Sequence, residues 1–221
     1  MNEVIQVQNP LIDHYVGVIR DEKTGKCDFA IAIENIVYLM SSSITGNIGT
    51  AKKTVKTPMA DTEVAYFIDK ILVIPILRAG LAMFEPIRKL VPQATFGYVG
   101  IKRKQEQSDD SALPNFSADM YYCNLPPNLH EFRVIILDIV VATGSTVEYV
   151  INHLLEQGVP QEKISLASII SSQEGISVLQ AKFPKVQMLT CALDPILTDE
   201  GMIVPGLGDA GNRYNGYDVP E

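Results

Sequence analysis

The sequence predicts an α/β fold in which helices flank a parallel sheet. Two observations lead to this prediction: short apolar runs recur from residue 71 onward, and segments with helical periodicity alternate with them. Strands that are apolar along their whole length are typical of parallel sheets covered on both faces. The length of 221 residues suits one sizeable domain, so we expect a single domain over residues 1–221.

The first expected element is an N-terminal helix over residues 29–40. Its apolar residues fall on one side: Phe29, Ile33, Ile36, Val37 and Met40. The run ILVIPI at 71–76 is expected as a buried strand, followed by a helix over 82–90. Pro86 lacks an N–H group, so it is expected in the first turn of that helix or at a local kink. Another strand is expected over 94–101.

The second half of the chain continues the alternation. The run VIILD at 134–138 is expected as a strand, and a helix over 146–157 follows after a loop of small residues. Apolar residues recur along that helix with helical spacing: Val147, Val150, Ile151, Leu154 and Leu155. Gly158 is expected to close it. Two more strands are expected over 164–170 and 186–192, separated by a helix over 175–183.

One stretch, residues 102–130, differs from the rest. It is polar, contains three prolines and shows no clear period. Long excursions of this kind in α/β enzymes are usually functional or mobile. We therefore expect an arm of approximately residues 102–132 that projects from the domain.

Charge and composition exclude several classes of protein. The formal net charge is −8, and no basic stripe is visible, so nucleic acid is not an expected partner. Cys27, Cys123 and Cys191 lie far apart, and the three histidines lack metal-ligand spacing, so no metal bound directly by the protein is expected. No apolar stretch approaches the roughly 18 residues of a membrane span, and no signal peptide is visible. We expect a cytoplasmic protein with no membrane partner.

The strongest local signal is the segment VIILDIVVATGST at 134–146, which leads from a buried strand into a helix. N–H groups at the start of a helix attract anions, and the hydroxyls of Thr143, Ser145 and Thr146 add donors. Gly144 removes a Cβ that would hold a phosphate away from the backbone. A Walker loop would carry a lysine here, so this loop suits a terminal monophosphate better than a nucleoside triphosphate.

A simpler interpretation of the same segment is that Ser145 or Thr146 caps the helix while Gly144 makes a turn. The four residues TGST leave both interpretations open. Asp138, at the end of the apolar strand, favours the ligand site, because ligands of open α/β sheets bind at the carboxyl ends of strands.

Three further segments give the chain a family resemblance. PILRAGL at 75–81, PGLGDAG at 205–211 and the opening NPLIDH at 9–14 lie in fixed order around the loop at 142–146, which we call the phosphate loop. In these segments the sequence resembles the uracil phosphoribosyltransferases, which join uracil to the ribose phosphate of phosphoribosyl diphosphate (PRPP). The resemblance implies a phosphoribosyltransferase-like sheet flanked by helices, a projecting arm, and a C-terminal base-binding segment of approximately residues 193–221. The pattern GxGxxG at 206–211 has no room for a βαβ unit, so it is not a dinucleotide site.

The resemblance assigns roles to individual residues. Arg78, which could otherwise form a surface ion pair, is expected to bind the pyrophosphate of PRPP together with Arg103. Asp138 would order the ribose hydroxyls or metal-bound waters, and Asp209 would lie near the ribose. Arg78, Asp138 and Asp209 are the expected catalytic residues. The 5′-phosphate would bind Ala142, Thr143, Gly144, Ser145 and Thr146, and uracil would bind the backbone of Ile203, Gly208, Asp209 and Ala210.

The implied reaction converts uracil and PRPP into UMP and diphosphate, a step of pyrimidine salvage. Mg²⁺ is the implied cofactor, bound mainly through the diphosphate of PRPP. The resemblance also implies a homodimer or higher homo-oligomer.

The chain departs from the family pattern at several positions. Ile139 replaces a proline, Ser145 and Thr146 replace Gly-Ser, Met202 replaces a tyrosine and Asn212 replaces an aspartate. The arm is longer and lacks the usual threonine. These departures leave three alternatives open: an active transferase for a different base, a non-catalytic homologue that senses PRPP or a nucleotide, and an RNA-binding regulator, which the acidic charge disfavours.

Overall fold

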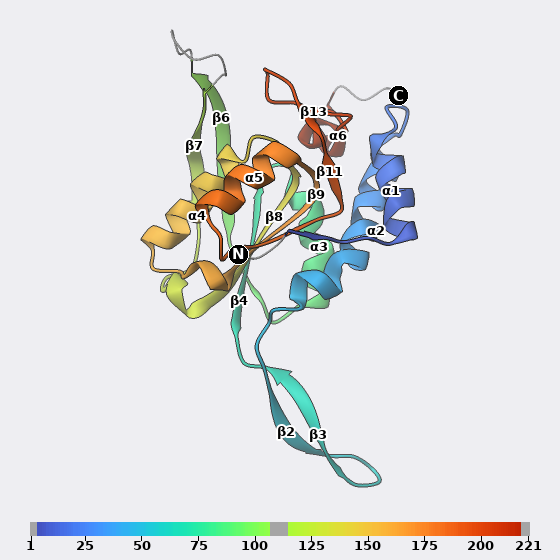
Figure 1. Cartoon of the computed structure of the whole chain (residues 1–221). Helices are drawn as coiled ribbons and strands as arrows, with labels where there is room; N and C mark the ends of the chain where they lie inside the picture. Colours follow the sequence, from blue (N-terminus) through green and yellow to red (C-terminus); the bar gives the residue numbers. More distant parts are fainter. Residues whose placement is uncertain (1–3, 107–114, 218–221) are drawn as a thin grey trace.

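The computed structural model of the chain describes residues 4–106 and 115–217, with side chains outside 103–118. Within these residues, a nine-stranded sheet forms the centre of the molecule (Figure 1), in the order β1-β10-β9-β8-β4-β6-β7, with β11 paired to β9 and β5 to β4. Neighbouring strands are parallel except β6 and β7. The bounds are β1 Ile5–Gln6, β4 Lys70–Leu77, β5 Thr95–Phe96, β6 Tyr98–Glu106, β7 Asn115–Asn124, β8 Phe132–Val141, β9 Ile164–Ser172, β10 Gln187–Thr190 and β11 Ala192–Asp194. The predicted α/β class with a mostly parallel sheet is confirmed.

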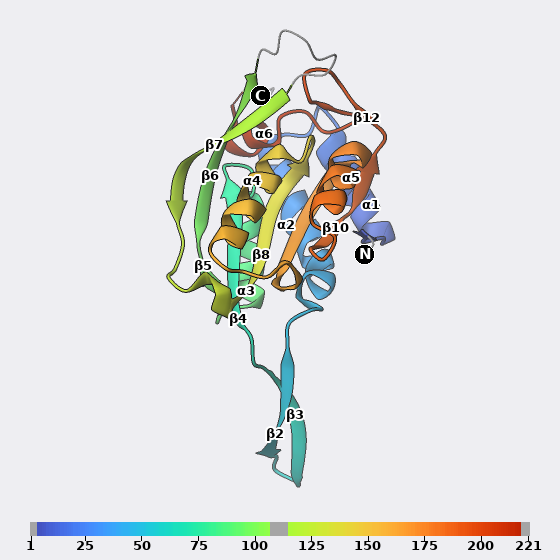
Figure 2. The ribbon, with the colours of Figure 1, turned by 60° about the vertical axis from the view of Figure 1, so that its left-hand side comes forward.

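Helices cover both faces of the sheet, as Figure 2 shows. Alternate residues of a strand point to opposite faces of its sheet. In β8, Ile135 and Leu137 belong to the core beneath α1, α2 and α3. Val134 and Ile136 belong to the core on the other face, beneath α4 and α5. The helices are α1 Pro10–Arg20, α2 Lys26–Thr45, α3 Leu81–Leu90, α4 Ser145–Glu156, α5 Gln173–Lys182 and α6 Ala210–Asn215. Strands buried on both faces explain why their sequence is continuously apolar.

Most expected elements are present, with shifted ends. The apolar stripe of α4 is buried at its first four positions, and Gly158 closes the helix with a φ of 82°. Pro86 lies in the second turn of α3, so of the two expected positions the first turn is excluded and the local kink stays a prediction. The strand expected over 94–101 is divided at Gly97 into β5 and β6.

Several elements were not expected from the sequence, among them helix α1 and a long hairpin. Helix α1 is capped by Asn9, whose side chain accepts a hydrogen bond from the N–H of Leu11 at 2.8 Å. A hairpin of β2 (Thr50–Lys56) and β3 (Asp61–Phe67) extends away from the sheet (Figure 1). The stretch expected as an arm over 102–132 contains most of the edge hairpin β6–β7 and the short 3₁₀ helix η1 (Leu129–Glu131), and residues 107–114 lie outside the described part. The bounds of the arm stay a prediction.

Helix α2 is long and apolar enough to cross a membrane by length and composition, so the expectation that no stretch approaches this length was wrong. Its apolar residues have a clear role in the fold. Phe29, Ile33, Ile36 and Met40 are fully buried in the core that α2 shares with α1 and α3. Packing against the sheet therefore accounts for the composition of α2.

The strand order places a topological switch point between β4 and β8. From β8 the chain proceeds through α4 to β9 and β10, whereas from β4 it proceeds through α3 to β6 on the other side. The two connections diverge on opposite faces of the sheet and leave a crevice at the carboxyl ends of β4 and β8. Ligands of open α/β sheets bind in such crevices. Arg78 and Asp138 both lie there.

Candidate active site

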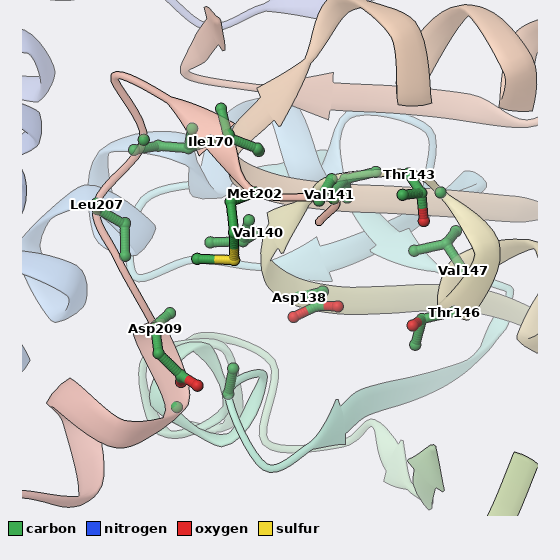
Figure 3. Close-up of a pocket in the computed structure, with 18 of the residues that line it drawn as sticks. Asp138, Val140, Val141, Thr143, Thr146, Val147, Ile170, Met202, Leu207 and Asp209 are labelled. Atoms are coloured by element: carbon green, nitrogen blue, oxygen red, sulfur yellow. The ribbon is translucent and has the colours of Figure 1, made fainter. Parts of the chain in front are cut away.

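Two adjoining cavities open at this crevice, and Figure 3 shows the first of them. One has a volume of about 250 Å³ and lies between the β8–α4 loop and residues 201–211. The other, of about 490 Å³, lies next to Arg78. Asp138, Thr146 and Asp209 line both. The two cavities therefore form one site with two halves.

The β8–α4 loop provides the wall expected for a phosphate. Ala142, Thr143, Gly144 and Thr146 line the first cavity, whereas Ser145 is not among its lining residues. Gly144 is the N-cap of α4, with a φ of 83° that favours glycine, and neither Ser145 nor Thr146 caps the helix. The Thr143 hydroxyl lies 2.9 Å from the Ser145 hydroxyl and accepts from the Ser145 N–H at 3.3 Å. The capping interpretation of Ser145 and Thr146 was therefore wrong.

The start of α5 holds this loop in place, a support that sequence reasoning missed. The Ser172 hydroxyl donates to the Ala142 carbonyl at 2.6 Å and accepts from the Gly175 N–H at 2.8 Å. A Cβ on Gly175 would lie 2.0 Å from the Ala142 oxygen. The loop and the helix can approach this closely because residue 175 has no side chain.

We expect Gly175→Ala to destabilise the protein by about 1–3 kcal/mol, because the added methyl forces α5 away from the loop. Helix propensity alone predicts the opposite sign, a gain of up to about 1 kcal/mol. Gly17→Ala in α1, where a Cβ meets nothing within 4 Å, is the matched control. Urea unfolding of both variants measures the effect, and equal stabilisation of the two would contradict the packing argument.

Asp138 lies at the centre of the site. Its carboxyl points into the pocket between Thr146 and Asp209 (Figure 3), and only 9% of the residue is exposed. Burial raises the pKa of Asp138 to about 7, although the N–H groups of Val140 and Ile139 oppose the shift by hydrogen bonding. The carboxyl is therefore poised between its charged and neutral forms near neutral pH.

Arg78 lies in the second half of the site, directly after β4. Lys102 and Tyr121 line this half with it, and both were absent from the expected site residues. A register shift between Gly100 and Ile101 leaves Tyr121 without a partner in the ladder, and its ring packs over Gly100. Such bulges redirect a side chain, which explains how an exposed edge strand contributes to the site. The Arg78 guanidinium also lies 5.7 Å from the centre of the Tyr217 ring.

The second expected arginine, Arg103, belongs to β6 by its backbone, which pairs with Ala118. Its side chain lies outside the described residues. Its role therefore remains a prediction.

The expected base-binding segment forms the opposite wall of the first cavity. Ile203, Gly208, Asp209 and Ala210 all line it. The Asp209 side chain caps α6 by accepting from the Asn212 N–H at 2.8 Å. Met202 projects into the cavity beside Val140 (Figure 3). Aliphatic side chains that were not expected at the site also line this cavity: Ala79, Ile101, Val140, Val141, Val147, Ile170 and Leu207.

Solved structures place this arrangement in a known class. The AQ2163 protein from Aquifex aeolicus superposes with a TM-score of 0.85 at 30% identity, covering 96% of this chain and 97% of that one. An adenine phosphoribosyl transferase from Trypanosoma brucei gives a TM-score of 0.52 at 13% identity, covering 87% and 83%, which is a likeness of fold. The fold is that of the phosphoribosyltransferases, with the site at the switch point of the sheet.

Sequence comparison narrows the class to one family. The model of the uracil phosphoribosyltransferase family matches residues 6–216. A uracil phosphoribosyltransferase from Clostridium kluyveri is 36% identical over 217 residues, which are 98% of this chain and 99% of the relative. A uracil phosphoribosyltransferase from a Thermoanaerobacter species is 37% identical over 214 residues, which are 96% of this chain and 97% of the relative. The chain belongs to the uracil phosphoribosyltransferase family, and the predicted resemblance is confirmed.

Proposed function

We propose that this protein transfers the 5-phosphoribosyl group of PRPP to uracil, forming UMP and diphosphate. One observation carries the proposal: the helix-start loop at 142–146 and the segment at 203–210 face each other across one cavity, with Asp138 between them. Family membership agrees with this arrangement. A salvage reaction of soluble phosphorylated metabolites fits the cytoplasm, and we propose that location.

Each wall has a distinct task in the proposed reaction. The N–H groups at the start of α4 bind the 5′-phosphate, since the first turn of a helix leaves these donors without partners in the helix. The backbone of residues 203–210 orients the base so that its N1 attacks C1 of the ribose. Arg78 stabilises the negative charge that develops on the departing diphosphate. Positioning of the two substrates contributes on the order of 7–11 kcal/mol in favourable reactions of this kind.

Mg²⁺ is proposed as the cofactor. Within the described residues, no group of three or more His, Cys, Asp or Glu could hold a metal ion. Asp138 and Asp209 do line the same crevice as Arg78, and carboxylate oxygens suit Mg²⁺, which is usually held by one or two carboxylates and the phosphates of a substrate. Bound with PRPP, Mg²⁺ would neutralise charge on the diphosphate, and Asp138 would orient ribose hydroxyls or metal-bound waters.

A different base is the alternative that a specific observation favours. Met202 occupies the cavity where the family pattern has a tyrosine, and a thioether offers no O–H donor. The test is diphosphate release from PRPP and Mg²⁺ with uracil, other pyrimidines and purines offered separately. Release with uracil supports the proposal. Release only with another base would show that the protein is a transferase for that base. Binding of PRPP without release would show a sensor.

We further propose a homo-oligomer in which hairpin β2–β3 packs on a second copy. Met59 at its tip is 92% exposed, and Tyr66 and Phe67 are also exposed. An isolated two-stranded hairpin is only marginally stable in water, so apolar residues on one suggest a partner surface. The double variant Met59→Lys/Tyr66→Lys is expected to shift the mass measured by light scattering toward the monomer. Leu11→Lys, at an exposed position on α1, is the control, and unchanged mass in both would contradict the interface.

A further inference from the structure

The base-binding wall has little secondary structure of its own. Residues 205–209 lie outside any helix or strand, between α6 and the two-residue strand β13 (Ile203–Val204), which pairs only with β12 (Ile196–Leu197) in the described structure. Recognition through backbone groups requires those groups to stay in place without substrate. Some other part of the molecule must therefore fix them.

A partly buried ion pair supplies the first attachment. The Arg20 guanidinium forms two hydrogen bonds with the Asp194 carboxylate, at 2.7 and 2.6 Å. The same pair holds both backbone groups of Gly206: the Gly206 N–H donates to Asp194 Oδ2 at 2.9 Å, and the Gly206 carbonyl accepts from Arg20 Nη1 at 2.7 Å. The Asp194 side chain is only 5% exposed, so water competes little for these bonds.

A second arginine attaches the next residue. Arg213 of α6 donates to the Leu207 carbonyl at 2.8 Å and also to the carbonyls of Ile19 and Asp21. Those two carbonyls belong to the end of α1, where helices leave acceptors without partners. The guanidinium also lies 4.4 Å from the centre of the Phe29 ring. Arg213 therefore connects residue 207 to α1 and α2.

We propose that Arg20, Asp194 and Arg213 are positioning residues for the base. They hold the Gly206–Leu207 backbone at a fixed position opposite the phosphate loop. None of the three is among the residues lining the cavities, so they act through the segment. The inference rests on the proposed function and adds to it the residues that determine how tightly the base binds. The phosphate loop is held by other hydrogen bonds, those of the Ser172 hydroxyl with Ala142 and Gly175. Asp194 pairs with Ser172 through the backbone of β11 and β9, but its side chain bonds Arg20 and Gly206 instead, so we expect loss of the side-chain bonds to act mainly on the base-binding wall.

The test separates the two substrates. In Asp194→Asn and Arg213→Lys we expect KM for uracil to rise about 10-fold or more, a factor that corresponds to one charge-assisted hydrogen bond. The dissociation constant of PRPP with Mg²⁺ should stay within about twofold of wild type. The control is Glu85→Gln, which alters another arginine–carboxylate pair with two hydrogen bonds, to Arg88, on the exposed surface of α3. Equal weakening of both substrates, or unchanged KM for uracil, would overturn the proposal.

A second measurement does not depend on turnover. Amide hydrogen exchange of the peptide spanning 201–211 should be faster in Asp194→Asn than in wild type or Glu85→Gln, while the peptide spanning 139–147 should be unchanged. Unchanged exchange over 201–211 would overturn the positioning role even if wild type converts uracil. If wild type converts no base, the proposed function fails, and faster exchange still supports the attachment of the segment.

Discussion

Replacing Arg78 with alanine is expected to lower kcat/KM for PRPP by about 10³-fold. Removing one donor that stabilises developing negative charge in an enzyme site costs on the order of 10²–10³-fold, and the guanidinium presents several donors in a planar fork. The departing diphosphate gains charge as the bond to C1 breaks, so the loss should fall mainly on kcat. Steady-state kinetics with PRPP varied at saturating uracil measure the effect.

Arg78→Lys is the informative companion, because lysine keeps the charge but not the planar fork. We expect it to recover only part of the activity. Lys102 lines the same half of the site and provides a further comparison, since Lys102→Ala removes a charge there without removing the fork. Equal, small losses in Arg78→Ala and Lys102→Ala would contradict a special role for Arg78.

Replacing Asp138 with asparagine is expected to reduce activity by about 10²-fold and to make the protein more stable at pH 8. Burial raises the pKa of Asp138 to about 7 from an ordinary value of 3.8, so the folded protein binds a proton over this range that the unfolded chain has lost. Stability from this group is fully present below about pH 4 and is lost as pH rises toward 7. The shift corresponds to an upper limit of about 4 kcal/mol, which the neutral asparagine would recover at pH 8.

The same titration predicts the pH dependence of the reaction. If the carboxylate orders ribose hydroxyls or metal-bound waters, kcat/KM for PRPP in wild type should fall about tenfold per unit as pH decreases below about 7. In Asp138→Asn this fall of kcat/KM below about pH 7 should be absent. Urea unfolding of wild type and Asp138→Asn at pH 5 and pH 8 measures the difference in stability. A variant that is no more stable than wild type at pH 8 would contradict the desolvation argument.

The position of the β8–α4 loop and the core were predictable because local patterns determine them. The apolar stripe of α4, the apolar run of β8 around Asp138 and the motifs around Arg78 and Gly208 each carry their signal within a few residues, although β8 continues to Val141 and does not end at Asp138. What could not be predicted depends on contacts distant in sequence. Ser172 and Gly175 support the loop from another element, and Arg20 reaches Asp194 across 174 residues. The bulge that redirects Tyr121 follows from strand register, which no local pattern reveals.

The hairpin β2–β3 was missed for a different reason. Strand β2 is mostly polar, and both strands are exposed at most positions, so the hairpin lacks the fully buried pattern of the core strands. The end of β3 does carry a short apolar run, VAYF at 64–67, but its residues are mostly exposed, and the run was not interpreted as a strand. Helix α1 was missed although Asn9 and Pro10 provide a cap and a favourable first residue.

We propose that one cavity holds the phosphate and the base of UMP on opposite walls. Hydrogen exchange of the wild-type protein with and without saturating UMP tests this arrangement. We expect slower exchange in two separated peptides, one over residues 138–147 and one over 201–211, with little change in the hairpin at 50–67. Binding of UMP that leaves either peptide unprotected, or no binding of UMP, would contradict it.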